Sequence, residues 1–324
     1  MGINQIKRTD FMESLRLSFT SIMPIFLLLL LGYGLKHLKL ADKACFDAMN
    51  RLVFKVFLPV LLFYNIYKTE SAQVFDPKLI LFTVVGVVCV FAVGNFAVLG
   101  ITKDNPKRGV ILQGFFRSNF AIFGVPLVNY ICGDSSSGLA SLMVAVVVPM
   151  FNVLAVISLE RFRGGSRVSV KRLFKGIITN PLIIGCIIGA IFFGFHIQLP
   201  QVLEKSVSDV SKIATPLAII ILGASFTFSS IKGYVRELAI VVSTRLVWVP
   251  LVMLTVAVLL GFRGEALACL LVVFGSPVAV SSFAMAQQMG GDEKLAGQVV
   301  VISSALCLPT LFVWIFVLGY LGLF

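Results

Sequence analysis

Charged residues are scarce in this chain. Only 13% of its 324 residues are Asp, Glu, Lys or Arg, and 58% are hydrophobic, whereas a soluble globular domain carries about 25% charged residues. This scarcity excludes an ordinary soluble domain and indicates an all-α polytopic membrane protein whose surroundings are the lipid bilayer. The net charge of +12 arises from basic residues between apolar runs. We attribute it to membrane orientation and expect no nucleic-acid partner.

The chain also lacks the residue clusters on which catalytic and metal sites depend. Its six cysteines show no CxxC spacing, and five of them lie in or beside apolar segments, so we interpret them as packing residues. The sequence contains no nucleophile–base pair, metal-ligand cluster or phosphate-binding loop. We therefore predict that the protein is not an enzyme and holds neither a metal nor a cofactor.

Ten apolar segments follow one another, each close to the roughly 20 residues that cross a bilayer. We predict that all ten are transmembrane helices joined by short loops. Their ranges are 17–36, 46–67, 79–101, 109–131, 138–159, 176–195, 207–228, 237–260, 265–288 and 295–321.

Lysine and arginine are distributed unevenly between the two sides of these segments. The connections after odd-numbered segments carry 15 of them, including the basic loop Arg161–Lys175, and the opposite side carries seven. Positive residues are retained in the cytoplasm. We therefore predict a multi-pass protein of the plasma membrane with both termini outside the cytoplasm.

Two stretches of the chain repeat each other 157 residues apart. Two prolines, a glycine and a lysine recur in the same order and spacing: Pro24, Gly32, Lys55 and Pro59, then Pro181, Gly189, Lys212 and Pro216. The offset spans five segments, an odd number, so the second copy must be inverted relative to the first. We predict a 5+5 inverted repeat, with residues 1–160 and 176–324 as its halves and a cytoplasmic loop at 161–175.

The fourth and ninth segments carry helix-breaking residues at matching places. Gly124 and Pro126 lie in the fourth, and Ser276-Pro277 lies in the ninth. A broken helix exposes backbone groups that are tolerated at membrane depth only in a cavity or inside protein. The amino end of its second half suits an anion. We predict that the two broken helices cross near the midplane and form a binding site there.

The chain resembles the auxin efflux carrier family, which includes the plant PIN auxin carriers and bacterial carriers of malate, malonate and related organic acids. The resemblance covers essentially the whole chain. It rests on Asn119-x4-Gly124-x-Pro126-Leu127, Asn152, Asn180-Pro181-Leu182, and the run from Ser276-Pro277 through Gly291-Asp292. The central loop, long in many plant members, is here the short stretch 161–175, which favours a bacterial-type carrier.

This resemblance implies a fold similar to that of sodium/proton antiporters and bile-acid symporters. It implies a scaffold made of helices 1, 2, 6 and 7 and a transport domain made of helices 3–5 and 8–10. It further implies a homodimer and an elevator-type motion, in which the transport domain slides against the scaffold.

Polar residues and helix breakers at membrane depth are the candidate substrate-binding residues. The Asn119 amide can hold a carboxylate, and Asn65 and Asn152 are expected to face the protein interior. The serines of the ninth segment have a second interpretation, in which they only satisfy helix backbone. The predicted set comprises Asn65, Asn119, Gly124, Pro126, Asn152, Ser276, Pro277, Ser281 and Ser282.

Five basic residues lie within the segments rather than between them, and four of them, Lys55, Arg117, Lys212 and Arg245, are weighed as candidates. We expect Arg117 and Arg245 to extend to the lipid headgroups, although each is also placed to attract anions into a vestibule. The same headgroup position is expected for Lys55 and Lys212. Their equivalence in the repeat leaves open a second interpretation, as paired charges at the two cavity mouths.

No Asp or Glu occurs near the middle of any segment. A sodium or proton antiporter of this fold needs a buried carboxylate for its cation, so the absence argues against cation exchange. We predict a secondary transporter of a small organic anion, such as malate, malonate or an auxin-like acid. A sodium-coupled symporter resembling the bile-acid group and a membrane receptor that binds without transport are the alternatives. The driving force stays open between uniport and proton symport.

Overall fold

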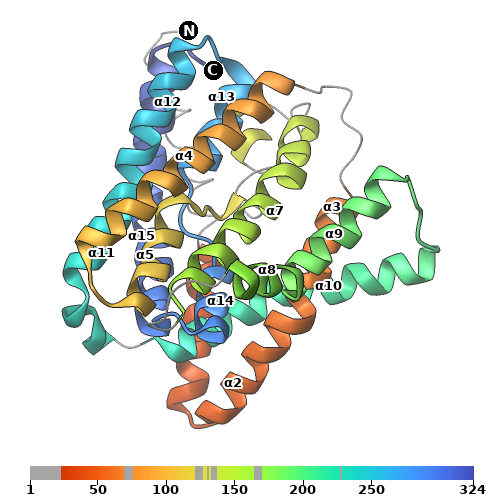
Figure 1. Ribbon diagram of the computed structural model, residues 1–324, viewed down its shortest axis with the longest axis vertical. Coiled ribbons are helices and arrows are strands. Elements are labelled where there is room, and N and C mark those ends of the chain that lie inside the picture. The colour runs from red at the N-terminus through yellow and green to blue at the C-terminus, as the bar shows by residue number, and fades with distance from the viewer. Residues whose placement is uncertain are drawn as a thin grey trace, which may run out of the picture.

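The computed structural model describes residues 23–68, 76–120, 127–129, 131–132, 137–163, 170–226 and 228–324. Within this part of the chain the secondary structure is helical, apart from one isolated β-bridge. Figure 1 shows α4, α15 and the rod that ends in α12 running along the length of the molecule.

The first half of the chain forms helices that match the predicted segments closely. An Asp side chain caps two of them: Asp42 accepts from the N–H of Cys45, and Asp76 accepts from the N–H of Leu79. The elements are a helix at Met23–His37, α2 (Lys43–Leu52), the π-helical η1 (Val53–Phe57), α3 (Leu58–Tyr67), α4 (Pro77–Ile101), α5 (Asn105–Phe116) and α7 (Ser137–Arg161).

The second half also forms helices throughout its described residues. The π-helical η4 joins α11 and α12 into one continuous rod, as η1 joins α2 and α3. The elements are α8 (Val170–Ile178), α9 (Pro181–Gly194), α10 (Gln201–Ser225), the 3-10 helix η3 (Phe228–Gly233), α11 (Val235–Ser243), η4 (Thr244–Trp248), α12 (Val249–Leu259), α13 (Gly264–Gly275), α14 (Ser281–Met289) and α15 (Glu293–Tyr320).

The sixth predicted segment and the basic loop before it differ from the prediction. Helix α8 begins at Val170, inside the stretch predicted as a loop, and ends at Ile178. Asn180 then caps the start of α9, because its side-chain oxygen accepts from the N–H of Leu182 at 2.9 Å. A capping asparagine followed by proline favours a new helix start over continuation.

Within the described residues, five helices are long and apolar enough to cross a membrane: Pro77–Ile101, Leu139–Arg161, Gln201–Ser225, Val235–Leu259 and Glu293–Tyr320. Shorter apolar helices lie at Met23–His37, Pro181–Gly194 and Gly264–Gly275. The outward surface of α4 exposes Leu81, Val93 and Phe96 by 64–72%. Such a surface suits lipid rather than water, so the prediction of a polytopic, all-α membrane protein is confirmed.

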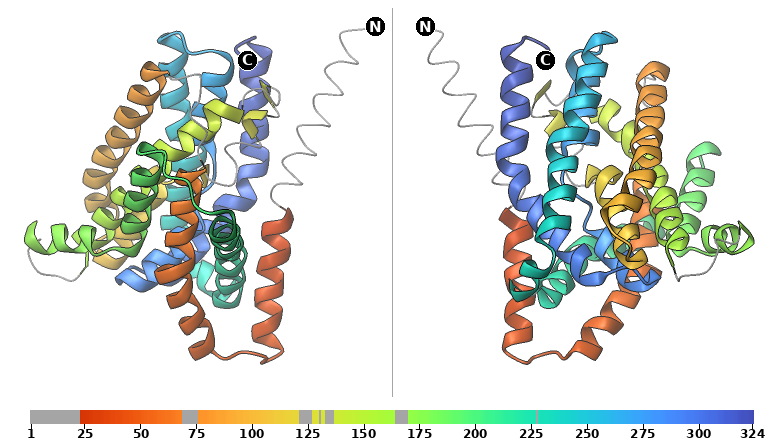
Figure 2. Two further views of the ribbon diagram at one scale, coloured as in Figure 1. Left: turned by 90° about the vertical axis from the view of Figure 1, so that its right-hand side faces the viewer. Right: turned by 60° about the vertical axis from the view of Figure 1, so that its left-hand side comes forward.

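Glycines bring two helix pairs into backbone contact. A Cβ on Gly32 would lie 1.9 Å from the carbonyl oxygen of Ile220, so the first helix touches α10 directly. A Cβ on Gly189 would lie 2.9 Å from the carbonyl oxygen of Phe63, so α9 also lies against the backbone of α3. Only a residue without a side chain allows this approach. Figure 2 shows the first helix and α2 joined by a short turn at the lower end of the molecule.

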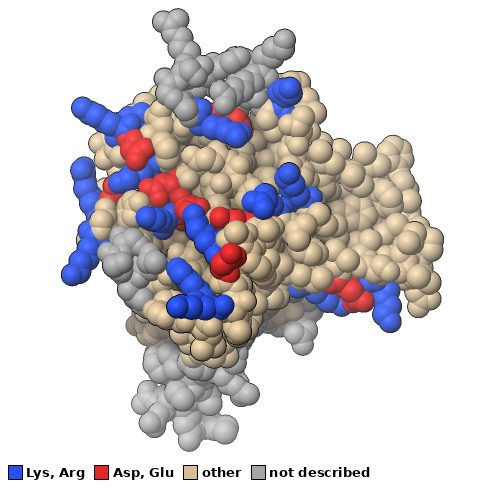
Figure 3. All heavy atoms as spheres, turned by 90° about the horizontal axis from the view of Figure 1, so that it is seen from below, with Lys and Arg blue, Asp and Glu red and all other residues tan. Residues whose placement is uncertain are grey.

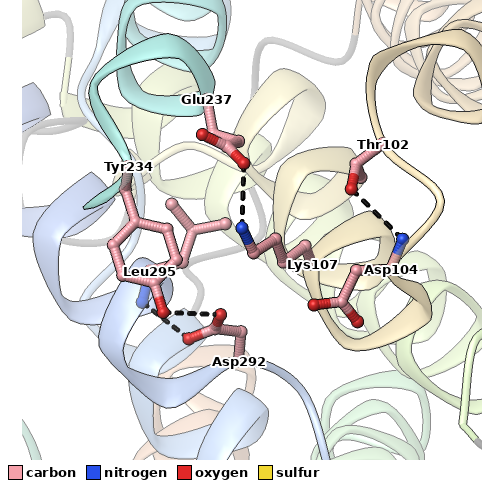
Figure 4. A network of polar contacts seen from close by, with 7 residues as sticks. All are labelled: Thr102, Asp104, Lys107, Tyr234, Glu237, Asp292 and Leu295. Atoms are coloured by element: carbon pink, nitrogen blue, oxygen red, sulfur yellow. Dashed lines mark hydrogen bonds and ion pairs between the residues drawn. The ribbon is translucent and has the colours of Figure 1, made fainter.

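Charged side chains gather at this lower end. Figure 3 shows Lys and Arg interspersed with Asp and Glu over part of the surface seen from below. Three connections meet in one polar network (Figure 4): Asp292 accepts from the Tyr234 hydroxyl at 2.9 Å, and its backbone N–H donates to the Pro106 carbonyl. Lys107 pairs with Glu237 at 3.0 Å and lies over the Tyr234 ring. The network joins the starts of α5, α11 and α15.

Candidate functional site

The fourth and ninth segments are both interrupted, and the interruptions lie against each other. Helix α5 ends at Phe116 and α13 ends at Gly275, and the backbone that follows each helix is extended. Ser118 and Val278 form an antiparallel β-bridge, and the Asn119 N–H donates to the Pro277 carbonyl at 2.8 Å. The half-helix α14 then leaves from Ser281. In Figure 1, α13 approaches from the upper end, and α5 and α14 lie below it.

The break in the fourth segment starts earlier than the sequence predicted. The expected position was Gly124-x-Pro126, but α5 already ends at Phe116. The pairing of Ser118 with Val278 requires extended backbone here, which ends the helix before the glycine is reached. Gly124 and Pro126 lie outside the described residues. In the ninth segment the break coincides with Ser276-Pro277, as predicted.

A cavity of about 60 Å³ lies beside this crossing. Its volume suits a ligand of few non-hydrogen atoms. Helices α3, α7 and α10 and both extended breaks contribute to its wall. Its lining residues are Leu58, Leu61, Leu62, Asn65, Arg117, Ser118, Asn119, Val148, Phe151, Asn152, Thr215, Ala218, Ala279, Val280 and Ser281.

Among the described residues that line it, Arg117 is the single ionisable one, and only 2% of its surface is exposed. Its Nη2 donates to the Oδ1 of Asn152 and the Oγ of Ser281, both at 2.8 Å. Its Nη1 donates to the Oε1 of Gln113 at 3.0 Å and contacts the Met285 sulfur. All of these partners are neutral, so they orient the guanidinium without cancelling its charge.

The surroundings of the cavity add no negative charge. Across the described residues, the buried charged side chains are Arg117 and Arg245, and no Asp or Glu is buried. The first turn of α14, at Ser281, faces the cavity and carries the partial positive charge of a helix amino end. A buried cation without a counter-charge is unfavourable, and an anionic ligand in the cavity would relieve it.

Asn119 supplies a second group that an anion can use. It is 5% exposed and lines the cavity, and its amide nitrogen has no hydrogen-bond partner within the described part of the chain. Arg117 and Asn119 are two residues apart on extended backbone, where alternate side chains point to the same side. The pair therefore presents a guanidinium and an amide donor to one space.

The structure gathers four of the predicted site residues around the cavity: Asn65, Asn119, Asn152 and Ser281. Asn152 is fixed by two contacts, because its amide nitrogen donates to the Val148 carbonyl at 2.8 Å while its oxygen accepts from Arg117. Ser276, Pro277 and Ser282 belong to the crossing but not to the cavity lining. Substrate contact by these residues stays a prediction.

Arg245 lies at the same crossing and contacts main-chain carbonyls instead of the cavity. It is fully buried and belongs to η4. Its Nε donates to the Ser276 carbonyl at 2.8 Å and its Nη2 to the Val273 carbonyl at 2.6 Å. Its Nη1 reaches the carbonyls of Phe116 at 3.2 Å and Phe115 at 3.5 Å. The side chain thus holds the carboxyl ends of both α5 and α13.

The expectation that Arg117 and Arg245 extend to the headgroups was wrong, because both are buried. The reason is that the crossing offers each guanidinium several acceptors at its own depth, so neither side chain has to reach the headgroups. Lys55 and Lys212 are exposed, as expected, and Lys212 pairs with Asp209 at 3.2 Å. Neither lysine lines the cavity described above.

Other kinds of site find no support in the described residues. They contain no group of three His, Cys, Asp or Glu side chains placed to hold a metal ion. Cys186, Cys269 and Cys307 are free thiols buried among apolar side chains. The candidate site is therefore the anion-compatible cavity at the crossing.

Comparison with known proteins places the chain in a family. The sequence profile of a family described as membrane transport protein matches residues 17–170 and 165–315. The chain belongs to this family. A transporter of Methanothermobacter thermautotrophicus, uncharacterized by name, is 25% identical over 305 residues, which cover 93% of this chain and 98% of that protein. The uncharacterized transporter MJ1031 of Methanocaldococcus jannaschii is 26% identical over 306 residues, covering 90% and 96%.

The plant branch of the family is represented as well. Auxin efflux carrier component 3a of Oryza sativa subsp. japonica is 23% identical over 160 residues, which are 48% of this chain and 26% of that protein. The predicted membership of the auxin efflux carrier family is thereby confirmed. Membership in this family identifies the chain as a membrane transporter.

Proposed function

We propose that this protein is a secondary transporter that carries a small organic anion, a mono- or dicarboxylate, bound in the cavity at the crossing. The observation that carries the proposal is Arg117, a buried guanidinium that faces the cavity and has neutral protein partners. The substrate carboxylate accepts from Arg117 and the Asn119 amide, and the amino end of α14 adds favourable charge.

Alternating access comes from an elevator-type motion in this proposal. The first helix, α3, α9 and α10 form the scaffold, and the glycine contacts support such a unit because they hold these helices at backbone distance. The helices that carry the crossing move as the transport domain. The lower polar network supports their movement as one body, since it ties α5, α11 and α15 together.

The 5+5 inverted repeat is part of the same proposal. The contact of Gly32 with Ile220 and the contact of Gly189 with Phe63 are related by the same 157-residue shift, because 32 + 157 = 189 and 63 + 157 = 220. A contact and its repeat-related copy are what an inverted duplication produces. With ten spans and the basic lower end in the cytoplasm, both termini lie outside. A homodimer in the plasma membrane completes the assignment.

The test is uptake by purified protein in liposomes, with ¹⁴C-labelled malate, malonate and indole-3-acetate as probes. We expect accumulation of at least one acid and a loss of roughly 100-fold in Arg117→Gln, because a charge-assisted hydrogen bond contributes about 1.5–3 kcal/mol. Arg263→Gln is the matched control. Arg263 is an exposed arginine in the connection before α13, and it donates to the main-chain carbonyls of Val258 and Phe262 rather than to cavity side chains.

Two results would overturn the proposal. One is wild-type uptake by Arg117→Gln, which would remove the guanidinium from substrate binding. The other is saturable binding of an acid with no counterflow across the liposome membrane, which would identify a receptor rather than a carrier.

A further inference from the structure

Arg245 is a charged side chain that the proposed anion site does not use. It is fully buried, and its three nitrogens contact four main-chain carbonyls, those of Phe115, Phe116, Val273 and Ser276. It extends from η4, a π-helical turn between α11 and α12. Such turns interrupt the regular helix pattern and occur frequently at functional sites.

These four carbonyls lie at the carboxyl ends of two half-helices, α5 and α13. The carboxyl end of a helix carries about half a negative elementary charge, so two carboxyl ends that meet present roughly one negative charge. A membrane interior has no water to satisfy them. One guanidinium supplies both the matching charge and the donors that these two ends require.

A cluster of half-helix carbonyl ends at membrane depth is the chemistry that transporters of this architecture use to hold sodium ions or protons. Here a covalently attached cation fills that position. We infer that Arg245 is a built-in substitute for a coupling cation, so that the carrier moves its anion without taking up sodium at the crossing. This inference rests on the proposed function, because it concerns how that transport is driven.

The absence of buried carboxylates points in the same direction. Within the described residues no Asp or Glu is buried, and the ionisable group in the cavity lining is Arg117. An attached cation returns with the empty carrier, so it contributes no net charge over a full cycle. The charge moved in each cycle is then that of the substrate itself. For an anion, the membrane potential becomes the driving force.

The first experiment needs no substrate and measures the thermal melting midpoint of the purified protein. The wild type is expected to melt at the same temperature in sodium chloride and in N-methylglucamine chloride. Arg245→Ala is expected to melt roughly 10 °C lower, because four buried carbonyls lose their donor. Millimolar guanidinium should raise the melting midpoint of Arg245→Ala most of the way back to the wild-type value, and N-methylglucamine should not raise it.

Two further variants separate this role from a general loss of packing. Arg245→Lys keeps the charge with fewer directed donors, so it should melt between the wild type and Arg245→Ala and gain less from guanidinium. Arg263→Ala removes an exposed arginine that also donates to carbonyls and should show neither the loss nor the rescue. The inference would be overturned if sodium raised the melting midpoint of the wild type. It would also be overturned if guanidinium failed to raise the lowered midpoint of Arg245→Ala.

The second experiment measures uptake of ¹⁴C-malonate into liposomes with and without sodium. We expect less than a twofold change on removing sodium and a severalfold stimulation by an inside-positive potential set with potassium and valinomycin. A tenfold fall without sodium would overturn the inference while leaving the proposed function intact. If malonate and the other labelled acids are not transported under any condition, the proposed function fails, and the melting experiment still decides the role of Arg245.

Discussion

Arg117 and Arg245 lie at one crossing of half-helices, but the groups that face them differ. Arg245 meets four carbonyls at two helix carboxyl ends, which together supply about one negative charge. Arg117 meets neutral side chains and the positive amino end of α14. A buried charge therefore acts as a structural element where the fold provides its counter-charge. Where the fold leaves it uncompensated, it acts as a binding element.

The largest effect comes from replacing each arginine with methionine. Arg245→Met is expected to lower the free energy of unfolding by about 3–5 kcal/mol, because it strands several buried carbonyls. Arg117→Met should cost less than half of that, since it also removes an uncompensated charge. Denaturant titration in detergent, followed by far-UV circular dichroism, measures both. Equal losses would break the contrast between the two residues.

A transported acid should stabilise the protein only while Arg117 is present. At a concentration 100 times its Kd, a ligand adds about 2.7 kcal/mol to stability. We expect this gain in the wild type and its absence in Arg117→Gln. Arg245→Lys should keep a gain of the wild-type size, because Arg245 does not line the cavity. Thermal melting with increasing acid measures each case, and a gain in Arg117→Gln would contradict the assignment.

Placing a carboxylate beside Arg117 should imitate the substrate. Asn119→Asp is expected to fold normally, because Arg117 provides the counter-charge, and to lower uptake about tenfold or more by occupying the guanidinium. The control is Asn95→Asp, which buries the same new charge on α4, away from the cavity lining. That control should lose stability. The reverse pattern of stabilities would show that Arg117 is already neutralised.

The smallest effect concerns the lower polar network, far from the two buried arginines. Burial and the hydrogen bond to Asp292 raise the pKa of Tyr234 from 10.0 to about 12. Because the folded-state pKa is the higher one, the contribution of Tyr234 is fully present below pH 10 and is lost as the pH rises toward 12. Tyr234→Phe should cost about 1 kcal/mol at neutral pH.

Alkaline unfolding followed at several pH values measures this loss. The wild type and Tyr234→Phe should converge as the hydroxyl ionises. A constant difference between them across that range would assign the stabilisation to packing of the ring rather than to the hydrogen bond with Asp292.

Sequence reasoning was most successful where a residue type limits the backbone. The break after Gly275 was placed correctly, because Pro277 cannot continue a buried helix. The break after Phe116 was predicted too late in the chain, at Gly124. It depends on the pairing of Ser118 with Val278, which is a contact between distant parts of the chain. No local propensity encodes such a contact.

The roles of Arg117 and Arg245 could not be predicted from their positions along the transmembrane segments alone. Depth within a segment gives the distance of a side chain from the headgroups but not the direction in which it points. One signal was available, because Gln113 and Arg117 are four residues apart and share a helix face. Arg245 had no such local partner. Its acceptors come from α5 and α13, which only the folded chain brings to it.

The β-bridge between Ser118 and Val278 has a consequence for how the two halves depend on each other. It joins residue 118 of one half to residue 278 of the other, and Arg245 of the second half satisfies carbonyls at the end of α5 in the first. If the halves were produced as separate polypeptides, each would lose its partner in this bridge, and the carbonyls at the end of α5 would lose their donor. Reconstitution would therefore require co-insertion of both fragments.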